Sequence, residues 1–421
     1  MATISTIIPK VQKVAYAIQK NKYITAISGG LMGLLPIMMI GSFSTLFAAL
    51  PIPAYQAFIK DIGLYNLLLA PSQVTINILS LYAVTAIAYK LAIQLDKDGI
   101  QAGLIALLMF LIVTPLQTLE SGASVIPMNW LGAAGLFVAM FIAILSTKIY
   151  SYTIDKKLVI SLPESVPVAV GKTFTALIPS FINVIIFTAV KGIFLLTPFE
   201  NAHSFVFNFI QMPLQGIGGT IGAVIFAVLI AQILWIFGIH GSMIVFSLIN
   251  PILTPLALQN LEAYQAGLPL PNVVIEPFIR QYVLIGGSGA TLGFCILMAF
   301  AAKSKQFKTM GRMALPASIC GINEPIIFGI PIVLNTKLII PFVAAPIVNC
   351  ILAYILTIIN VIPRLNGATT PFGTPTVISG VLAGGWQTAV FQVFLIALDL
   401  AIYYPFFKSV DKDAYDLETD S

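Results

Sequence analysis

One carboxylate stands inside the apolar stretch ICGINEPIIFG, residues 319–329. Only 9% of the 421 residues are charged, so an acidic side chain at this place is unusual. Gly321 lies shortly before Glu324 and Pro325 follows it directly, and both residue types disfavour the interior of a helix. Glu324 is therefore predicted to lie at a helix break, where its carboxylate can accept hydrogen bonds or a proton.

A second group with acid–base chemistry is His240, in the stretch WIFGIHGSM, residues 235–243. The chain has two histidines, and the other, His203, is predicted to lie in a polar loop. Gly238 and Gly241 flank His240 at the junction of two uncharged runs. A histidine at a helix end is commonly a structural hydrogen-bonding residue, so its spacing leaves a structural role and a site role equally open.

The composition indicates that lipid is the solvent for most of the chain. Hydrophobic residues make up 58% of it and the mean hydropathy is +0.98, whereas about a quarter of the residues in a soluble domain are charged. A helix needs about 20 apolar residues to cross the hydrocarbon core. Uncharged runs of this length occupy residues 26–50, 99–119, 127–147, 216–239, 281–302 and 338–363. Shorter or interrupted runs occupy residues 72–89, 173–190, 241–261, 313–335 and 376–407.

These runs predict an all-α polytopic membrane protein with about ten transmembrane helices plus re-entrant hairpins. Basic residues cluster at residues 10–22, 90–97, 148–172, 303–312 and 408–412, and such clusters are typical of cytoplasmic loops. Alternation between the two sides then places both termini in the cytoplasm. It also requires one run after residue 312 to enter and return on the same side. The run 313–335 is the most interrupted by glycine and proline, so it is predicted to be a re-entrant hairpin.

A re-entrant hairpin must be buried in protein or line a wet cavity, because unpaired backbone groups are too costly in lipid. Glu324 would lie at its break, and an ionisable residue at membrane depth predicts a functional site. The alternative is a structural carboxylate that pairs with a neighbouring helix.

Other polar and sulfur-containing residues carry weaker signals. Cys295, Cys320 and Cys350 share no short metal-binding spacing and are predicted to be small buried residues, so no metal and no cofactor is expected. No nucleotide-binding motif or basic nucleic-acid patch occurs. Smaller predictions are a surface ion pair between Glu276 and Arg280, capping or pairing of Asp399, an irregular loop at residues 369–375, and an interfacial helix with Val11, Val14, Ala15 and Ile18 on one face.

The stretch GINEPIIFGIPIVLN, residues 321–335, resembles the signature of the membrane (C) components of phosphoenolpyruvate-dependent sugar phosphotransferase systems. GIHG, residues 238–241, and GGSGATLG, residues 286–293, resemble the lactose, cellobiose and diacetylchitobiose branch, and the similarity runs along the whole chain. The resemblance implies that the chain has the fold of these C components and lies in the bacterial cell (inner) membrane. Residues 1–212 would form a helical domain with the interfacial helix and the first five spans, which makes a homodimer. Residues 213–421 would form the sugar-binding transport domain with re-entrant hairpins.

The resemblance also implies roles for site residues. Glu324 matches the signature glutamate that binds the sugar, Asn323 lies next to it, and His240 matches the histidine that faces it. Glu324 can accept hydrogen bonds from two hydroxyls, and His240 can both donate and accept. A carboxylate near the 6-hydroxyl would also act as a general base for phosphorylation.

Tryptophans provide candidate stacking surfaces for the apolar faces of a sugar. Trp235 and Trp386 fall in the second half of the chain and are the stacking candidates. A place in the interfacial belt is the alternative for each of them, and it is the prediction for Trp130.

The function implied by the resemblance is a permease for a β-linked disaccharide, with diacetylchitobiose or cellobiose preferred. It would translocate the sugar by an elevator-like movement for coupled phosphorylation. Only a short acidic tail follows the last run and no phosphoryl-carrying residue is recognised, so the donor is expected to be a separate cytosolic B subunit with a phosphocysteine, docking on the basic loop 303–312. The alternative is a proton-coupled secondary sugar transporter that uses Glu324 and His240, since a titratable pair in the membrane allows this equally well.

Overall fold

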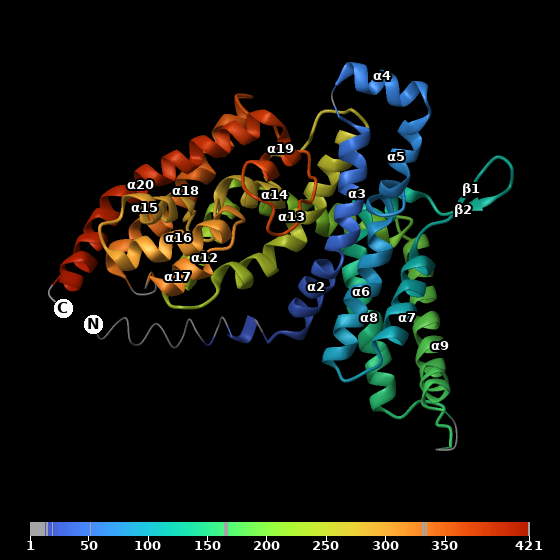
Figure 1. Ribbon diagram of the computed structural model, residues 1–421. Coiled ribbons are helices and arrows are strands. Elements are labelled where there is room, and N and C mark those ends of the chain that lie inside the picture. The colour runs from blue at the N-terminus through green and yellow to red at the C-terminus, as the bar shows by residue number, and fades with distance from the viewer. Residues whose placement is uncertain are drawn as a thin grey trace. The chain divides into compact units, whose positions relative to one another are not determined.

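The structure is a computed structural model that describes residues 13, 16–18, 20–50, 52–163, 167–330, 332 and 335–419 (Figure 1). Two compact units are distinguished by their internal contacts. The first unit is Gln19–Gly216, and the second is Ile217–Ser421 together with Met1–Ile18. The predicted domain boundary after residue 212 lies close to this division. The roles of the two domains in dimerisation and transport stay predictions.

The first unit is built around α6, which packs against α2, α7 and α8. The approach of α2 to α6 is close at Gly30, where an added Cβ atom would lie 2.9 Å from the backbone nitrogen of Ile87. The helices and strands of this unit are α2 (Lys22–Gly33), α3 (Leu35–Ala48), α4 (Pro53–Asp61), α5 (Leu64–Gln73), η1 (Ile76–Ile78), α6 (Leu79–Gln94), α7 (Gly99–Val113), β1 (Gln117–Thr118), β2 (Ser124–Val125), η2 (Met128–Trp130), η3 (Ala133–Gly135), α8 (Leu136–Asp155), α9 (Val168–Leu195), α10 (Ala202–Val206) and η4 (Phe207–Gln211). The helix α11 (Met212–Gly218) follows in the chain.

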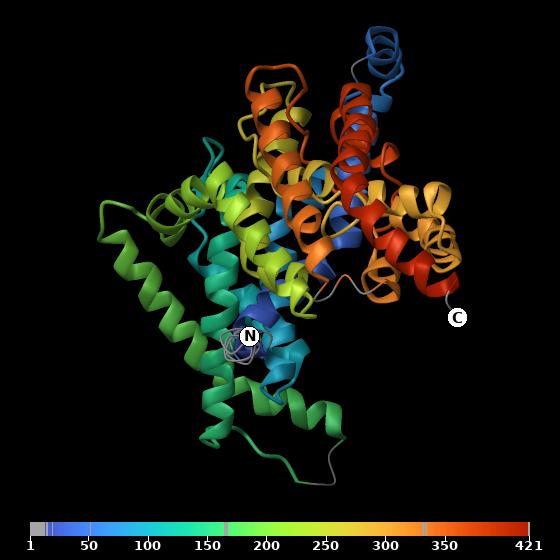
Figure 2. The same cartoon turned by 90° about the vertical axis from the view of Figure 1, so that its left-hand side faces the viewer.

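In the described residues after Gly218, the second unit has ten helical elements, which Figures 1 and 2 show in yellow-green to red. Its core includes the buried side chains of Trp235, Phe294, Phe342 and Tyr403. The elements are α12 (Ile221–Ile236), α13 (Gly241–Gln265), α14 (Glu276–Phe278), η5 (Ile279–Val283), α15 (Leu292–Ala301), α16 (Lys305–Ile319), α17 (Glu324–Gly329), α18 (Thr336–Ile358), α19 (Ile378–Gly384) and α20 (Trp386–Thr419).

Among the described residues, six helices are long and apolar enough to cross a membrane. They occupy Leu64–Gln94, Ala133–Asp155, Val170–Leu195, Gly241–Gln265, Lys337–Ile358 and Trp386–Thr419. Two bent pairs, α2 with α3 and Ala202–Gly218 with α12, raise the number to 8 if each pair is one span. The predicted fold class, an all-α polytopic membrane protein, is confirmed. The predicted number of about ten crossings exceeds what this length criterion finds in the described part of the chain.

The apolar run 281–302 is not one continuous helix. It consists of the end of η5, a glycine-rich loop at residues 286–291 and the short helix α15. Gly286, Gly287 and Gly289 have φ values of 74°, 101° and 77°, in the left-handed region that favours glycine. An added Cβ atom at Gly287 would lie 2.4 Å from Oδ1 of Asn323. Hydropathy alone could not detect this break, which brings the loop beside the residues around Glu324.

The predicted break in the run 313–335 is present. The helix α16 ends at Ile319, Gly321 adopts a φ of 79°, and α17 begins at Glu324 with Pro325 in its first turn. Proline fits there because the first backbone N–H groups of a helix have no partner within it. Pro331, Val333 and Leu334 lie outside the described residues, and the re-entrant path of the whole segment stays a prediction.

The prediction for His203 is wrong. This residue lies in α10, not in a polar loop, and its side chain is fully buried. Its Nε2 atom lies 3.0 Å from the hydroxyl of Thr114, and its ring packs against Phe110 and Trp130. The contact with His203 gives Trp130 a packing role in the first unit.

The smaller predictions have mixed outcomes. Arg280 Nη2 lies 3.0 Å from Glu276 Oε1, which confirms the ion pair. Cys295 and Cys350 are buried free thiols, whereas Cys320 is only half-buried. Asp399 is buried in α20, and the Nδ2 atom of Asn349 donates to both of its carboxylate oxygens. Val11, Val14 and Ala15 lie outside the described residues, and Ile18 packs against the cluster formed by Ala227, Ala231, Leu234, Ile244 and Val245.

Candidate functional site

His240 is held at the start of α13 by its own backbone and by its imidazole ring. The chain turns at Gly238, whose φ is 74°, and the Nδ1 atom of His240 accepts a hydrogen bond from the backbone N–H of Met243 (3.2 Å). An added Cβ atom at Gly241 would lie 1.9 Å from the carbonyl oxygen of Ala231, so only glycine fits there. The two flanking glycines therefore place His240, and its role as N-cap leaves Nε2 free to face away from the helix.

Trp235 supports the ring of His240. The two ring centroids are 4.4 Å apart at an interplanar angle of 46°, and the indole N–H donates to the hydroxyl of Ser242 at 3.3 Å. Trp235 is only 2% exposed. Its ring face is covered in this conformation, so the structure supports orientation of His240. Stacking on a sugar, the sequence-based expectation, requires the ring to be uncovered.

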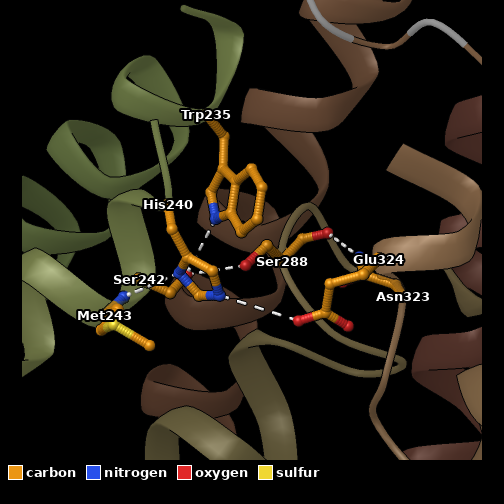
Figure 3. A network of polar contacts seen from close by, with 7 residues as sticks. All are labelled: Trp235, His240, Ser242, Met243, Ser288, Asn323 and Glu324. Atoms are coloured by element: carbon orange, nitrogen blue, oxygen red, sulfur yellow. Dashed lines mark hydrogen bonds and ion pairs between the residues drawn. The ribbon is translucent and has the colours of Figure 1, made fainter. Parts of the chain in front are cut away.

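Glu324 faces His240 from the start of α17. Its Oε1 atom lies 3.7 Å from Nε2 of His240, which is too long for a direct hydrogen bond (Figure 3). The side chains of His240 and Glu324 are 38% and 45% exposed, so both can be reached from solvent. The other oxygen of Glu324, Oε2, is shielded from solvent and has no hydrogen-bond partner among the described residues. This carboxylate therefore has unused acceptor capacity beside a histidine that can donate.

Asn323 joins the break before α17 to the glycine-rich loop. Its Nδ2 atom donates to the carbonyl oxygen of Ser288 (2.6 Å) and to the hydroxyl of Thr291 (2.7 Å). The hydroxyls of Ser288 and Ser242 are 2.7 Å apart. Figure 3 shows the resulting network, which runs from Trp235 through these two serines to Asn323. In this structure Asn323 orients the loop, and its two amide protons are already used.

Ser242 and Ser288 are the site residues that sequence reasoning missed. Each lies within or directly after a glycine motif, GIHG or GGSG, that had been singled out for its glycines. A hydroxyl inside a glycine-rich stretch is a usable signal, because glycine brings the backbone close and leaves that hydroxyl as the polar side chain. The structure therefore extends the candidate site to two hydroxyls near His240.

Trp386 is not brought together with the other four predicted residues. It is the first residue of α20, and its side chain is 68% exposed. No hydrogen bond, ion pair or ring contact joins it to His240, Asn323, Glu324 or Trp235 in the described part of the chain. Its proposed stacking role stays a prediction.

Two other kinds of site lack support in the described residues. No group of three or more His, Cys, Asp or Glu side chains is placed to hold a metal ion. A shallow groove lies between α12 and α18, but aliphatic side chains such as Leu229, Ile233 and Ile347 line it. Such a surface suits lipid chains and offers no partner to a sugar hydroxyl. The polar groups gather instead around His240 and Glu324.

Comparisons with known proteins agree with this picture. The family model described as "Phosphotransferase system, EIIC" matches residues 28–346. The chain belongs to the EIIC family of the phosphotransferase system. This EIIC component is 38% identical to the lichenan permease IIC component of Bacillus subtilis (strain 168), over 98% of this chain and 94% of the relative. It is 39% identical to the cellobiose-specific EIIC component of Geobacillus stearothermophilus, over 96% of this chain and 93% of the relative.

A solved structure is similar as well. The transporter ChbC, the IIC component of an N,N'-diacetylchitobiose-specific phosphotransferase system, matches with a TM-score of 0.92 and 36% identity, covering 97% of this chain and 98% of that chain. These matches place the EIIC component in the lactose and cellobiose branch. They also establish a multi-pass membrane protein that acts as a sugar permease of a bacterial phosphotransferase system.

Proposed function

We propose that this EIIC component binds a β-linked disaccharide between His240 and Glu324. It then carries the sugar across the membrane by an elevator-like movement for coupled phosphorylation. The observation that carries the proposal is the placement of the Glu324 carboxylate. Its Oε1 atom lies 3.7 Å from the Nε2 atom of His240, and its Oε2 atom is shielded from solvent with no hydrogen-bond partner among the described residues. A buried acceptor without a partner is costly, and a ligand hydroxyl would satisfy it.

The chemistry of a sugar matches this arrangement. Each hydroxyl that leaves water needs a new partner, and a carboxylate can accept from two hydroxyls at once. The Nε2 atom of His240 and the hydroxyls of Ser242 and Ser288 supply further polar groups near Glu324. A carboxylate close to the reacting hydroxyl would also take its proton as a phosphoryl group arrives.

The class of sugar is supported by the relatives. Their descriptions name lichenan, cellobiose, oligo-beta-mannoside, galactose and lactose, and the solved structure is described for N,N'-diacetylchitobiose. Several of these are β-linked sugars, and the higher identities belong to the lichenan and cellobiose proteins. We therefore infer a β-linked disaccharide, with cellobiose or diacetylchitobiose as the first choices for a binding panel.

The phosphoryl donor is proposed to be a separate cytosolic B subunit with a phosphocysteine. The relatives described as EIIC components support a separate donor, whereas the lactose-specific relatives are described as EIICB components and are matched over only about 70% of their length. Homodimerisation through the first unit, a cytoplasmic position of both termini and the docking role of residues 303–312 belong to the same proposal.

The deciding experiment is uptake into sealed vesicles that contain this EIIC component. Accumulation of sugar phosphate that requires phosphoenolpyruvate and the B subunit supports the proposal. Accumulation of unmodified sugar driven by a pH gradient supports the alternative, a proton-coupled transporter using Glu324 and His240. A binding panel on the purified protein in the same vesicles identifies the disaccharide.

A further inference from the structure

The C-terminal end of α20, which is predicted to lie in the cytoplasm, carries carboxylates that accept hydrogen bonds from the start of α16. Asp411 accepts hydrogen bonds from the backbone N–H groups of Lys303 (2.9 Å) and Ser304 (3.0 Å). Glu418 accepts from the hydroxyl of Ser304 (2.7 Å) and from the N–H groups of Lys305 (2.8 Å) and Gln306 (2.9 Å). Two side chains from one helix thus accept five hydrogen bonds at the start of another.

This contact satisfies the N-terminus of α16 almost completely. The first backbone N–H groups of a helix have no partner within it, and the helix dipole favours negative charge there. Glu418 takes the N–H groups of Lys305 and Gln306, while Ser304 caps the helix by accepting from the N–H of Phe307 (3.2 Å). Residues 303–312 also include four basic residues, so the charge of the two carboxylates is complementary to that of this segment.

The same end of α20 also attaches to the start of α18. The ammonium group of Lys337 forms an ion pair with Asp413, and Asn335 caps α18 by accepting from the N–H of Lys337 (3.0 Å). Residues 303–337, which contain Glu324, are therefore tied to α20 at both ends. Figures 1 and 2 show the C-terminal end of α20 beside the orange helices of this segment. We call Asp411, Asp413 and Glu418 the carboxylate clamp.

The path from the clamp to Glu324 is tightly packed. Gly311 of α16 lies so close to α15 that an added Cβ atom would be 2.4 Å from the backbone nitrogen of Ala299. At the far end of α16, the carbonyl oxygen of Ile319 accepts from the N–H (2.8 Å) and the hydroxyl (3.0 Å) of Thr376. Ile326 of α17 is fully buried in the core of the second unit. Because these contacts leave little free space along α16 and α17, we expect a shift at the start of α16 to displace the break at Glu324 as well.

We propose that Asp411 and Glu418 are positioning residues that set the place of Glu324 opposite His240. They act through the register of α16, and Asp413 fixes the far end of the segment. The inference deepens the proposed function because it names residues far from the sugar that determine how the site is formed.

The test compares Glu418→Gln and Asp411→Asn with a matched control, Asp416→Asn. Asp416 lies on the same helix with an exposed side chain, and its substitution makes the same change of charge. Glu418→Asp keeps the charge and serves as the conservative variant. Hydrogen exchange of the full chain in nanodiscs is measured for peptides covering residues 303–310 and 320–330, together with the affinity for cellobiose and diacetylchitobiose.

Glu418→Gln and Asp411→Asn are expected to accelerate exchange in both peptides and to weaken sugar binding about fivefold. Glu418→Asp should recover part of both effects, and Asp416→Asn should change neither. Faster exchange confined to residues 303–310, with residues 320–330 and the affinity as in the unmodified protein, would overturn the proposal. If the unmodified protein binds neither sugar, the proposed substrate class fails, while the exchange at residues 320–330 still decides the role of the clamp.

Discussion

Each unit of the protein contains one histidine beside a tryptophan, and the two histidines are placed very differently. In the first unit, His203 is fully buried between Phe110 and Trp130, and its Nε2 atom meets the neutral hydroxyl of Thr114 at 3.0 Å. In the second unit, the ring of His240 lies against Trp235, but the side chain is 38% exposed and its Nε2 atom faces Glu324. The aromatic neighbour is therefore no guide to function.

The two histidines differ in the surroundings of their Nε2 atoms. The Nε2 atom of His203 is engaged within a packed core, so no ligand can reach it without opening the first unit. The Nε2 atom of His240 has a carboxylate at a distance too long for a hydrogen bond and remains accessible. The comparison teaches that the candidate site is recognised by accessible polar groups that face each other and not by residue type.

The largest effect is expected from Glu324→Gln, because it removes the carboxylate that faces His240 and that His203 lacks. Gln keeps the shape but cannot take a proton, so sugar phosphorylation should fall by about a hundredfold or more. Sugar affinity should fall less, by about tenfold, because one oxygen acceptor remains. Both are measured in vesicles supplied with the B subunit and phosphoenolpyruvate.

The control for this substitution is Glu276→Gln, because Glu276 also precedes a proline at the start of a helix but is paired with Arg280. It should leave phosphorylation nearly unchanged. Equal losses of binding and phosphorylation in Glu324→Gln would contradict the general-base role and leave only a binding role.

The next effect concerns the backbone of the glycine-rich loop. Gly287→Ala should lower the free energy of unfolding by about 1–3 kcal/mol and impair sugar binding, because φ is 101° and the new methyl group would meet Asn323 at 2.4 Å. Gly192→Ala in α9 of the first unit is the matched control, since nothing lies within 4 Å of an added Cβ atom there. Chemical denaturation in detergent and sugar titration measure the two quantities. A Gly287→Ala protein with unchanged stability and affinity would show that the loop is not constrained as described.

Substituting the two histidines tests the comparison directly. His203→Ala should lower the free energy of unfolding by about 2 kcal/mol, because it removes a buried hydrogen bond and leaves a cavity. His240→Ala should instead weaken sugar binding by about tenfold with a smaller change in stability, because the side chain is partly exposed. Denaturation and binding are measured on both variants. If both substitutions changed the free energy of unfolding and the sugar affinity in the same way, the two histidines would not have the different roles described.

The smallest effect concerns Asp98, which caps α7 with its side chain as His240 caps α13. Asp98 accepts from the N–H groups of Ile100 and Gln101 (3.1 Å each) and pairs with Lys172 at 3.1 Å. Partial burial opposes ionisation of Asp98, but these hydrogen bonds and the charge of Lys172 outweigh it and lower its pKa. A lowered pKa in the folded state stabilises the protein above the pKa of the unfolded chain, and this stabilisation is lost as the pH falls through the folded pKa.

Asp98→Ala is expected to cost about 1 kcal/mol of stability near neutral pH, and Asp98→Asn less, because asparagine also caps helices well. Both variants should lose less stability than the unmodified protein on acidification below about pH 4. Denaturation curves across this pH range measure the difference. An unchanged acid dependence in both variants would mean that Asp98 contributes no pH-dependent stability.

Several features of the site were predictable from neighbouring residues. Gly321 and Pro325 predicted the helix break, and the structure places Glu324 at the start of α17. The flanking glycines located a helix junction at His240, and the Glu-Pro signature with its two glycine motifs indicated the family that the comparisons establish. Composition alone identified a membrane protein. Such signals are local because they report the backbone conformation and the solvent of the residues that carry them.

Tertiary structure alone decided which of these residues meet and which are accessible. It buried His203, covered the ring of Trp235, exposed Trp386, and brought Ser242 and Ser288 into one network with Asn323. It also showed that carboxylates of the acidic tail contact both ends of the segment that bears Glu324, which the sequence did not indicate. Exposure and contacts between distant segments follow from packing of the whole unit, and no local pattern of residues encodes them.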